Sequence, residues 1–595
     1  MSKARKFYEE KIKDAEDKIK KLNSEISKIS ILRLAIVLIG IGVAYKLYTS
    51  LGFVPSAIGV IVTLGIFMAV AVVHGNKINE KDILSTIIEI NSMGLKRLDG
   101  GYREFEDKGK EFIEEEDHFC EDLDVFGQNS LFQMINTTRN ISVRKKLAEI
   151  LSVGTLPTKE KIIEKQKAIK ELGDKVEWRQ KLYINSTFKK KHEDIEGLVE
   201  WGKEKSSEKS KVIIACVFIA ITMISIFMVI AKIIPISMLI LNFIVNFMVI
   251  KVLTKNSESS IHLFNSIKNS VKAYSNILAL IEDEEFESDY LKDLKSKLNN
   301  TQSNSCKKEM QKLSNLLEWV GDSSGNAYFF VLNIVIFADV FILYNLNKWR
   351  EANGDKIEGW LEVMGEFDAL SSIANISFDH EDWCYPEISN NKEVEGKEIS
   401  HPLIGERAVA NDFVLKNPKQ IVLITGSNMS GKSTFLRTIG INLILSYIGA
   451  PVSAKSFKCG IMNIYTCMRT KDNLEESISS FYAEILRIKL VIEACNRGED
   501  VFFLLDEIFK GTNSKDRHTG ATVLVKQLAQ KGAIGLLSTH DLELCDLENT
   551  MKELDNYNFR EYYEDNKIKF DYKLRQGKST TQNAVYLMKL AGIEI

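Results

Sequence analysis

The stretch that decides the fold reads Ile421-Val-Leu-Ile-Thr425, then Gly426-Ser427-Asn428-Met429-Ser430-Gly431-Lys432-Ser433-Thr434. The first five residues are apolar and β-branched, which is typical of a buried strand. The next nine fit the pattern G-x-x-x-x-G-K-[ST] of a phosphate-binding loop, and a helical pattern begins at Phe435. Since the pattern requires this order of strand, loop and helix, the sequence predicts an α/β nucleotide-binding domain.

Each part of this loop has a predicted role. The glycines let backbone N–H groups curl around phosphate oxygens, and the following helix N-terminus attracts negative charge. Lys432 is expected to reach the β- and γ-phosphates, and Ser433 to ligate Mg²⁺. The expected cofactors are therefore ATP and Mg²⁺. The predicted nucleotide-binding residues are Gly426, Ser427, Asn428, Met429, Ser430, Gly431, Lys432, Ser433 and Thr434.

Two later strands end in residues that suit catalysis. Val501-Phe-Phe-Leu-Leu505 leads into Asp506 and Glu507, and Ala533-Ile-Gly-Leu-Leu537 leads into Ser538-Thr-His540-Asp. Asp506 is predicted to hold Mg²⁺ through water, and Glu507 to act as base or polariser for the attacking water. The strand-end position suits His540 for sensing the γ-phosphate, while a structural role is the alternative for a lone histidine.

Four apolar runs predict two transmembrane hairpins. The runs cover residues 31–48 and 51–73, then 212–231 and 233–250. Each has about the ~20 residues that a helix needs to cross a bilayer. Residues 1–30 carry nine Lys and Arg, whereas the short outer links hold almost none. This asymmetry predicts a multi-pass protein of the cell membrane, with the N-terminus, the core and the nucleotide domain cytoplasmic.

A fifth apolar run covers residues 328–345 and contains Asp339. A fifth crossing would place the nucleotide-binding loop outside the cell, where ATP is absent. The run is therefore predicted to be a buried helix of the soluble part.

The segment before the first run has a heptad pattern. Its apolar positions are Tyr8, Ile12, Ala15, Ile19, Leu22, Ile26 and Ile29. This spacing predicts one helix continuous with the first span. Pairing with the helix that leaves the second span is favoured over a dimeric coiled coil, which stays the alternative.

Composition narrows the classes of function. The formal charge is −3, which argues against a nucleic-acid binder that works by bulk positive charge. The eight cysteines are scattered with no C-x-x-C pair, so neither a zinc site nor a disulfide framework is expected.

Several motifs together resemble the MutS family. They are the loop with Asn428-Met429 inside it, His401-Pro402, Asp472-Asn473, Ser479-Ser-Phe-Tyr-Ala-Glu484, Asp506-Glu-Ile-Phe-Lys-Gly-Thr512 and Ser538-Thr-His-Asp541. Leu123-Asp-Val-Phe-Gly127 is similar to the start of the family's core domain. The resemblance implies an ABC-like P-loop ATPase domain of MutS type, joined to an all-α core and lever region. It implies ATP hydrolysis, with Lys432, Glu507 and His540 as catalytic residues and His540 as the switch histidine.

The resemblance also implies a composite site. Asn428 would lie near the γ-phosphate, and Ser479 would reach the γ-phosphate of a partner across a homodimer of ATPase domains. The second hairpin falls where the family inserts the clamp that grips DNA. The expected domains are a heptad helix with the first hairpin (1–111), first core part (112–211), second hairpin in place of the clamp (212–250), returning lever and core (251–400) and ATPase domain (401–595).

These patterns together predict a membrane-anchored MutS-like ATPase that moves lever helices coupled to membrane lipid or a membrane protein. The alternative is a DNA-binding protein that tethers mismatched or branched DNA to the membrane. A small transporter built like an ABC exporter is disfavoured, because the sequence contains no Leu-Ser-Gly-Gly-Gln.

Overall fold

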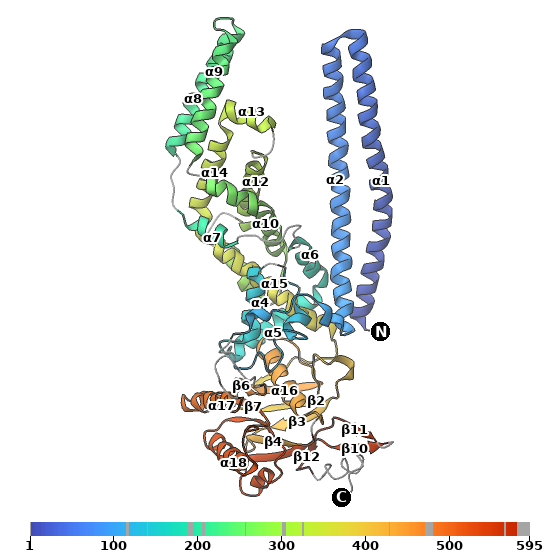
Figure 1. Cartoon of the computed structure of the whole chain (residues 1–595), viewed down its shortest axis with the longest axis vertical. Helices are drawn as coiled ribbons and strands as arrows, with labels where there is room; N and C mark the ends of the chain where they lie inside the picture. The colour runs from blue at the N-terminus through green and yellow to red at the C-terminus, as the bar shows by residue number, and fades with distance from the viewer. Residues whose placement is uncertain are drawn as a thin grey trace. The chain divides into compact units, whose positions relative to one another are not determined.

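The chain forms two compact units, and Figure 1 labels their elements. Unit 1 comprises residues 1–136, 148–180 and 373–595, and unit 2 comprises residues 137–147 and 181–372. The structure is a computed structural model that describes residues 2–114, 118–139, 141–186, 195–204, 209–255, 258–299, 305–323, 327–427, 429–469, 480–564 and 567–579.

The described regions before residue 380 are helical, as predicted. Residues 387–399, expected in the all-α return part that ends at residue 400, instead form two strands that pair with strands of the nucleotide domain. The helices before the first strand are α1 (Lys3–Leu51), α2 (Phe53–Leu98), α3 (Leu131–Ile135), α4 (Ile141–Ser152), α5 (Lys159–Asp174), α6 (Val176–Ser186), α7 (Ile195–Lys203), α8 (Lys209–Ile230), α9 (Ile236–Thr254), α10 (Glu258–Asp283), α11 (Asp289–Ser296), α12 (Cys306–Ser323), α13 (Ala327–Ile336), α14 (Ala338–Asn353) and α15 (Ile357–Asp379).

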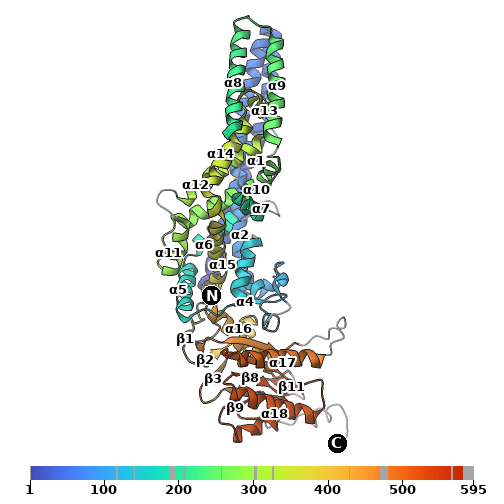
Figure 2. The same cartoon turned by 90° about the vertical axis from the view of Figure 1, so that its left-hand side faces the viewer.

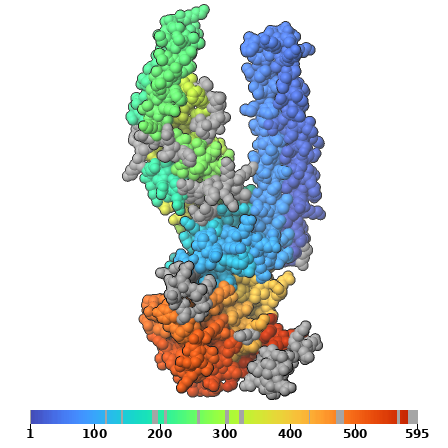
Figure 3. Space-filling model, in the orientation of Figure 1, coloured from blue at the N-terminus to red at the C-terminus, as the bar shows by residue number. Residues whose placement is uncertain are grey.

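The first hairpin consists of α1 and α2, which pack along their length and form the blue column of Figure 3. The heptad segment and the first span are one helix, as predicted. Gly52 alone links the two helices at φ +89°, a conformation that favours glycine, and its N–H donates to the Tyr48 carbonyl. The heptad helix thus pairs within the chain.

A buried polar cluster fixes the base of this hairpin within unit 1. Tyr8 donates to Asp379 Oδ1 at 2.6 Å, and Arg97 Nε donates to Asp379 Oδ2 at 2.7 Å. Arg97 and Asp379 are almost fully buried. A Cβ on Gly94 would lie 2.5 Å from the Tyr8 ring, so the two helices meet closely here. The base of the hairpin is therefore joined to the end of α15.

The second hairpin consists of α8 and α9 in unit 2. The fourth span was predicted to begin at residue 233, but α9 begins at Ile236 because Pro235 is its N-cap and interrupts the helical pattern. Within the described residues, four helices are long and apolar enough to cross a membrane: α1, α2, α8 and α9.

The prediction for residues 328–345 was wrong in one respect. The run forms two helices, α13 and α14, separated by Phe337 at φ +52°. Phe337 is fully buried, whereas Phe330 is 52% exposed. Packing at Phe337 and a side-chain cap by Asn333, described below, favour the break over a continuous helix.

The nucleotide domain is built on a sheet of six strands within the described residues, in the order β12-β9-β4-β8-β7-β6. From β9 to β6, neighbouring strands are parallel. Its strands are β4 (Ile421–Thr425), β6 (Asn463–Cys467), β7 (Val501–Asp506), β8 (Ile534–Ser538), β9 (Leu554–Asn558) and β12 (Arg575–Gln576). The three predicted strands are therefore present and adjacent.

Helices cover both faces of this sheet. Phe503 and Leu505 pack with α17 (Ser480–Asn496) and α18 (Ser514–Gln530), which lie beside the sheet in Figure 2. Leu504 faces Gly440 of α16 (Lys432–Tyr447). The remaining strands are β1 (Glu387–Ser389), β2 (Val394–Ile399), β3 (Asn411–Leu415) and β5 (Ser456–Gly460) in one sheet, and the pair β10 (Glu561–Glu564) and β11 (Lys567–Phe570).

Candidate functional site

The loop between β4 and α16 requires glycine at both ends. Gly426 has φ +146°, and a Cβ there would lie 2.7 Å from Ser430 Oγ and 2.8 Å from the Phe559 carbonyl oxygen. Gly431 has φ +110° and is the N-cap of α16. Ser430 Oγ is buried and has no hydrogen-bond partner among the described residues, so the loop offers an unused polar atom beside its backbone. These features fit a loop that closes around phosphate oxygens.

Lys432 lies at the centre of the site. Its side chain is 3% exposed, and Nζ donates to the carbonyl oxygens of Gly426 at 3.0 Å and Ser427 at 3.1 Å. Nζ also lies 3.3 Å from Glu507 Oε1. Burial lowers the pKa of Lys432, and the charge of Glu507 opposes that shift. The ammonium group is thus held inside the loop by weak oxygen partners that phosphate could replace.

Glu507 is joined to both other predicted catalytic residues. Its Oε1 lies 2.7 Å from His540 Nε2 and 3.3 Å from Lys432 Nζ. The hydrogen bond from His540, with the charges of His540, Lys432 and Lys510, lowers the pKa of Glu507 to about 2, although burial opposes this. The structure therefore brings together Lys432, Glu507 and His540.

Asp506 and Ser433 offer oxygen ligands near this cluster. Asp506 accepts a hydrogen bond from Ser538 Oγ, and the Glu507 N–H donates to the Ser538 carbonyl at 3.1 Å. Ser433 lies in the first turn of α16 and lines the pocket described next. Hydroxyl and carboxylate oxygens are the donors that Mg²⁺ prefers, so this set fits the predicted metal.

A pocket of about 430 Å³ opens beside the loop. This volume is within the range of small-molecule sites. Its lining residues are Ile399, His401, Ile404, Arg407, Ala408, Val409, Asn411, Met429, Gly431, Lys432, Ser433, Thr434, Phe435, Thr438, Glu507, Phe559 and Tyr572. The sequence did not identify Arg407, Phe559 or Tyr572, because these residues belong to no local motif and only folding brings them beside the loop.

Acidic residues of the core segment contact the domain next to the loop. Asp124 lies 2.8 Å from Arg469 and 3.4 Å from Arg437, which follows the loop by three residues on α16. Asp122 is fully buried and accepts from Arg487 at 2.9 Å. The segment predicted to start the core is thus tied by charge to α16 and α17.

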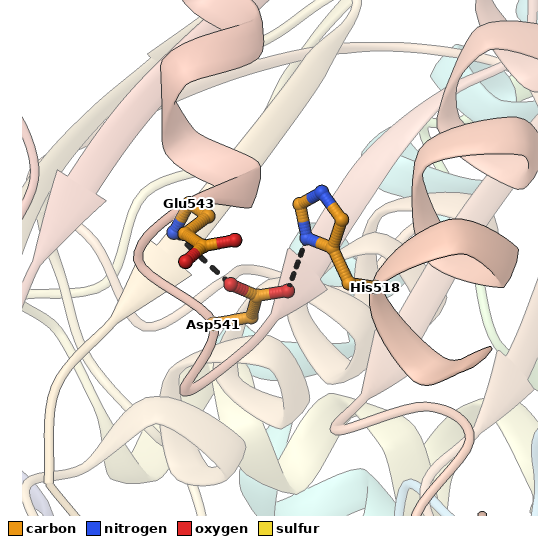
Figure 4. Close-up of side chains that lie close together, drawn as sticks. All are labelled: His518, Asp541 and Glu543. Atoms are coloured by element: carbon orange, nitrogen blue, oxygen red, sulfur yellow. Dashed lines mark hydrogen bonds and ion pairs between the residues drawn. The ribbon is translucent and has the colours of Figure 1, made fainter. Parts of the chain in front are cut away.

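A trio supports the turn that carries His540. Figure 4 shows His518 and Asp541 pointing toward each other, with Nδ1 and Oδ2 2.6 Å apart. Asp541 Oδ1 also accepts from the Glu543 N–H at 3.0 Å. The ligand atoms of the three residues lie within 4.8 Å of one another. These two hydrogen bonds hold Asp541, the residue that follows His540, in place.

Several predicted residues fall outside the described part of the chain. Asn428 and Ser479 lie outside it, as do Asp472 and Asn473. The other predicted loop residues are described: Ser427 donates to Glu561 at 2.8 Å, Met429 is 83% exposed, and Thr434 lines the pocket.

Comparisons with known proteins relate the C-terminal part of the chain to one family. The family model described as MutS domain V matches residues 422–594. The DNA mismatch repair protein MutS of Persephonella marina is 33% identical over 245 residues, which is 40% of this chain and 28% of that protein. The same-named proteins of Aquifex pyrophilus and Bacillus mycoides are 32% and 31% identical over 40% of this chain, and 28% and 27% of their own lengths. The chain thus spans less than a third of the curated relatives that it matches, and its C-terminal part is a MutS domain V.

Proposed function

We propose that this protein is a membrane-anchored ATPase. Mg²⁺-dependent hydrolysis of ATP, at a composite site between two ATPase domains, moves lever helices coupled to the membrane or to a membrane partner. The observation that carries the proposal is the meeting of Lys432, Glu507 and His540 at a glycine-shaped loop beside a pocket of nucleotide size.

The chain's own residues account for the polar steps. Bound MgATP supplies the γ-phosphoryl group that water attacks. Its phosphate oxygens replace Glu507 and the loop carbonyls as partners of Lys432, because they carry more negative charge. The hydrogen bond from His540, the largest cause of the low pKa of Glu507, remains, and loss of the Lys432 charge removes one smaller cause, so Glu507 would act as base toward the attacking water.

The remaining ligand roles follow from residue chemistry and the family resemblance. Ser433 and Asp506 would hold Mg²⁺. The family resemblance would place Asn428 near the γ-phosphate and Ser479 at the site of a partner chain in a homodimer. The aromatic rings of Phe559 and Tyr572 line the same pocket as the loop, and an adenine ring could stack on such surfaces. These features favour a nucleotide over free phosphate.

Exposed apolar surface supports the membrane location. In the most apolar 18-residue window of α1, α2, α8 and α9, only 6%, 0%, 11% and 11% of residues are buried within the protein. Soluble proteins rarely expose apolar patches of more than a few hundred Å². We therefore place both hairpins in the cell membrane, with the N-terminus, core and ATPase domain in the cytoplasm.

Substitutions at the nucleotide site test the reaction. Lys432→Ala should abolish ATP binding, because the phosphates lose their buried counter-charge. Glu507→Gln should bind ATP but lose at least about 10²-fold in turnover, the usual effect of removing a general base. Lys416→Ala, which removes an exposed lysine of the same domain, is the matched control and should retain both activities. Normal turnover by Glu507→Gln would contradict the assigned role.

Labelling by a membrane-impermeant maleimide tests the topology. In a variant without native cysteines, cysteine at Thr49 or Ile234 should react from outside intact cells. Cysteine at Ser2 or Lys416 should react only after permeabilisation. Equal reaction at all four positions of intact cells would contradict the proposed topology.

The relatives are named DNA mismatch repair proteins, so the DNA tether is the second candidate function. Saturable binding of mismatched or branched DNA at physiological salt would favour it. ATP turnover that rises with added lipid vesicles, without DNA binding, would favour the membrane ATPase.

A further inference from the structure

The two helices of the fifth apolar run pack against the second hairpin. Phe337 and Val340 form a buried cluster with Ala215 of α8 and Ile250 of α9. The Phe218 and Phe337 rings lie 6.1 Å apart. Figures 1 and 2 both place α13 beside α8 and α9, and all four helices belong to unit 2. The break between α13 and α14 therefore lies on the surface of a candidate membrane hairpin.

A hydrogen bond between Asn246 of α9 and the end of α13 shows how far along the second hairpin α13 lies. Asn246 Nδ2 donates to the Ile334 carbonyl and to Thr222 Oγ1, both at 2.8 Å. Asn246 is fully buried and lies ten residues after the first residue of α9 and eight before the last. At about 1.5 Å per residue, it lies about 15 Å from one end of the helix and about 12 Å from the other. The end of α13 is thus level with the middle of α9.

Local hydrogen bonds stabilise the break itself. The Phe337 N–H donates to the Asn333 carbonyl at 2.8 Å. The Asn333 side chain donates to Asp339 Oδ2 at 2.6 Å and accepts from the Asp339 N–H at 3.1 Å. Non-helical backbone at membrane depth is tolerated only where it is buried in protein or lines a water-filled cavity. A buried Phe337 and a self-capped turn meet the first condition.

Both legs of the turn begin on the same side. Trp349 Nε1, near the end of α14, donates to the carbonyl of Glu309, near the start of α12, at 2.9 Å. The chain therefore rises through α12, turns between α13 and α14, and returns through α14 to the level where it started. The outer surface of the turn is apolar, with Phe330 52% and Ile336 39% exposed.

We propose that α13 and the first turns of α14 form a re-entrant membrane segment. Its Ile334 lies at the middle of the bilayer beside α8 and α9, the chain turns at Phe337 at the level of Ala215 and Ile250, and α14 leaves on the side from which the segment entered. Its exposed face, with Phe330 and Ile336, contacts lipid acyl chains. The proposal rests on the proposed function, because it requires that α8 and α9 cross the membrane.

Spin labels in vesicles of phosphatidylcholine and phosphatidylglycerol test this placement. Single cysteines at Phe330 and Ile336 carry the label, with Phe227 on α8 as the lipid-facing control and Asp289 on α11 as the aqueous control. All four positions are exposed, so the substitutions should not disturb folding. We expect the ratio of oxygen to nickel-chelate accessibility at Phe330 and Ile336 to match Phe227 and to exceed Asp289 several-fold.

The outcomes separate the two proposals. In one outcome, the label at Phe227 reports lipid while Phe330 and Ile336 show the same oxygen to nickel-chelate ratio as Asp289. That result would overturn the re-entrant segment alone. An aqueous ratio at Phe227 would overturn the membrane hairpin and with it the inference. A cysteine at Ala352 that an impermeant reagent labels from the side opposite to Asp289 would show a full crossing and would also overturn re-entry.

Discussion

The two apolar hairpins differ in what lies beyond their membrane-length portions. Helices α1 and α2 have 49 and 46 residues, whereas α8 and α9 have 22 and 19. At about 1.5 Å per residue the first pair extends about 70 Å and the second about 30 Å, which is close to the thickness of the bilayer core. The first hairpin is therefore a rod with a long polar part, and the second has only the length of a span.

The two hairpins also differ in where their buried polar contacts lie along the helices. The first hairpin has its buried ions at the base, where Tyr8, Arg97 and Asp379 meet outside the apolar part. The second has neutral hydrogen bonds at mid-length, between Thr222, Asn242 and Asn246. Charges are costly in lipid and neutral amides less so, which fits this distribution. Buried polar contacts therefore hold the first hairpin at its base and the second hairpin at its middle.

The largest expected effect comes from removing the acid at the base of the first hairpin. Asp379→Asn leaves the buried guanidinium of Arg97 without its anion. Such a change should destabilise the protein by about 3–5 kcal/mol. Thermal unfolding in detergent measures the loss, with Lys96→Ala at an exposed ion pair as the control. A loss as small as the control's would show that the base does not hold the hairpin.

A second prediction concerns Asp368, an acid of α15 in unit 2. Burial raises its pKa to about 7, above the ordinary value near ~3.9 of an unfolded chain. Between these pH values only the folded state keeps the proton, so stability should fall as pH rises through this window. Asp368→Asn should remove about 2–3 kcal/mol of the stability change between pH 5 and pH 8.

Unfolding midpoints across this pH range measure the effect. The exposed Asp289→Asn is the matched control and should keep the wild-type slope. An unchanged slope in Asp368→Asn would contradict a raised pKa of Asp368.

Close packing at the base of the first hairpin predicts a smaller loss of stability on substitution of Gly94. Gly94→Ala places a methyl group 2.5 Å from the Tyr8 ring and should cost about 1–3 kcal/mol. Gly75→Ala in the same helix has nothing within 4 Å and should be neutral or slightly stabilising. Unfolding of the two variants side by side measures the difference. Equal stability would contradict a tight contact between α1 and α2.

The smallest effect is expected inside the second hairpin. Asn246→Leu removes the hydrogen bonds to Thr222 and the Ile334 carbonyl and should cost about 0.6–1.7 kcal/mol, as for similar bonds in membrane proteins. Unfolding by sodium dodecyl sulfate in mixed micelles measures it. Ile240→Leu, at an exposed position of α9, is the control. A variant as stable as this control would show that α13 is held by apolar packing alone.

The sequence predicted the features that depend on neighbouring residues. The strand before Gly426, the helix after Gly431 and the acids after Val501–Leu505 follow from local patterns, because one motif contains strand, loop and helix. The four long apolar helices follow from composition over about 20 residues. The resemblance to the MutS family implied that Lys432, Glu507 and His540 act together, and the parallel strands β4, β8 and β7 bring their carboxyl ends to one edge of the sheet.

Other features depend on contacts between distant residues and could not be predicted. The sequence near Phe337 holds no Gly or Pro, and two polar residues, Asn333 and Asp339, do not by themselves interrupt an apolar helix. The break depends on packing against α8 and α9 and on the Asn333 cap. Likewise Tyr572 reaches the pocket from more than 130 residues beyond the loop, and no spacing rule connects them.

The link between α1 and α2 bears on how the protein enters its membrane. Only Gly52 separates the two helices, and its N–H is already bonded to the Tyr48 carbonyl. A hairpin with so short a tip carries little across the bilayer besides the unpaired backbone groups at the two helix ends, so its barrier to translocation is smaller than that of a long polar loop. If the first hairpin crosses the membrane as we propose, both helices can insert together from the side of synthesis, without exporting a polar domain.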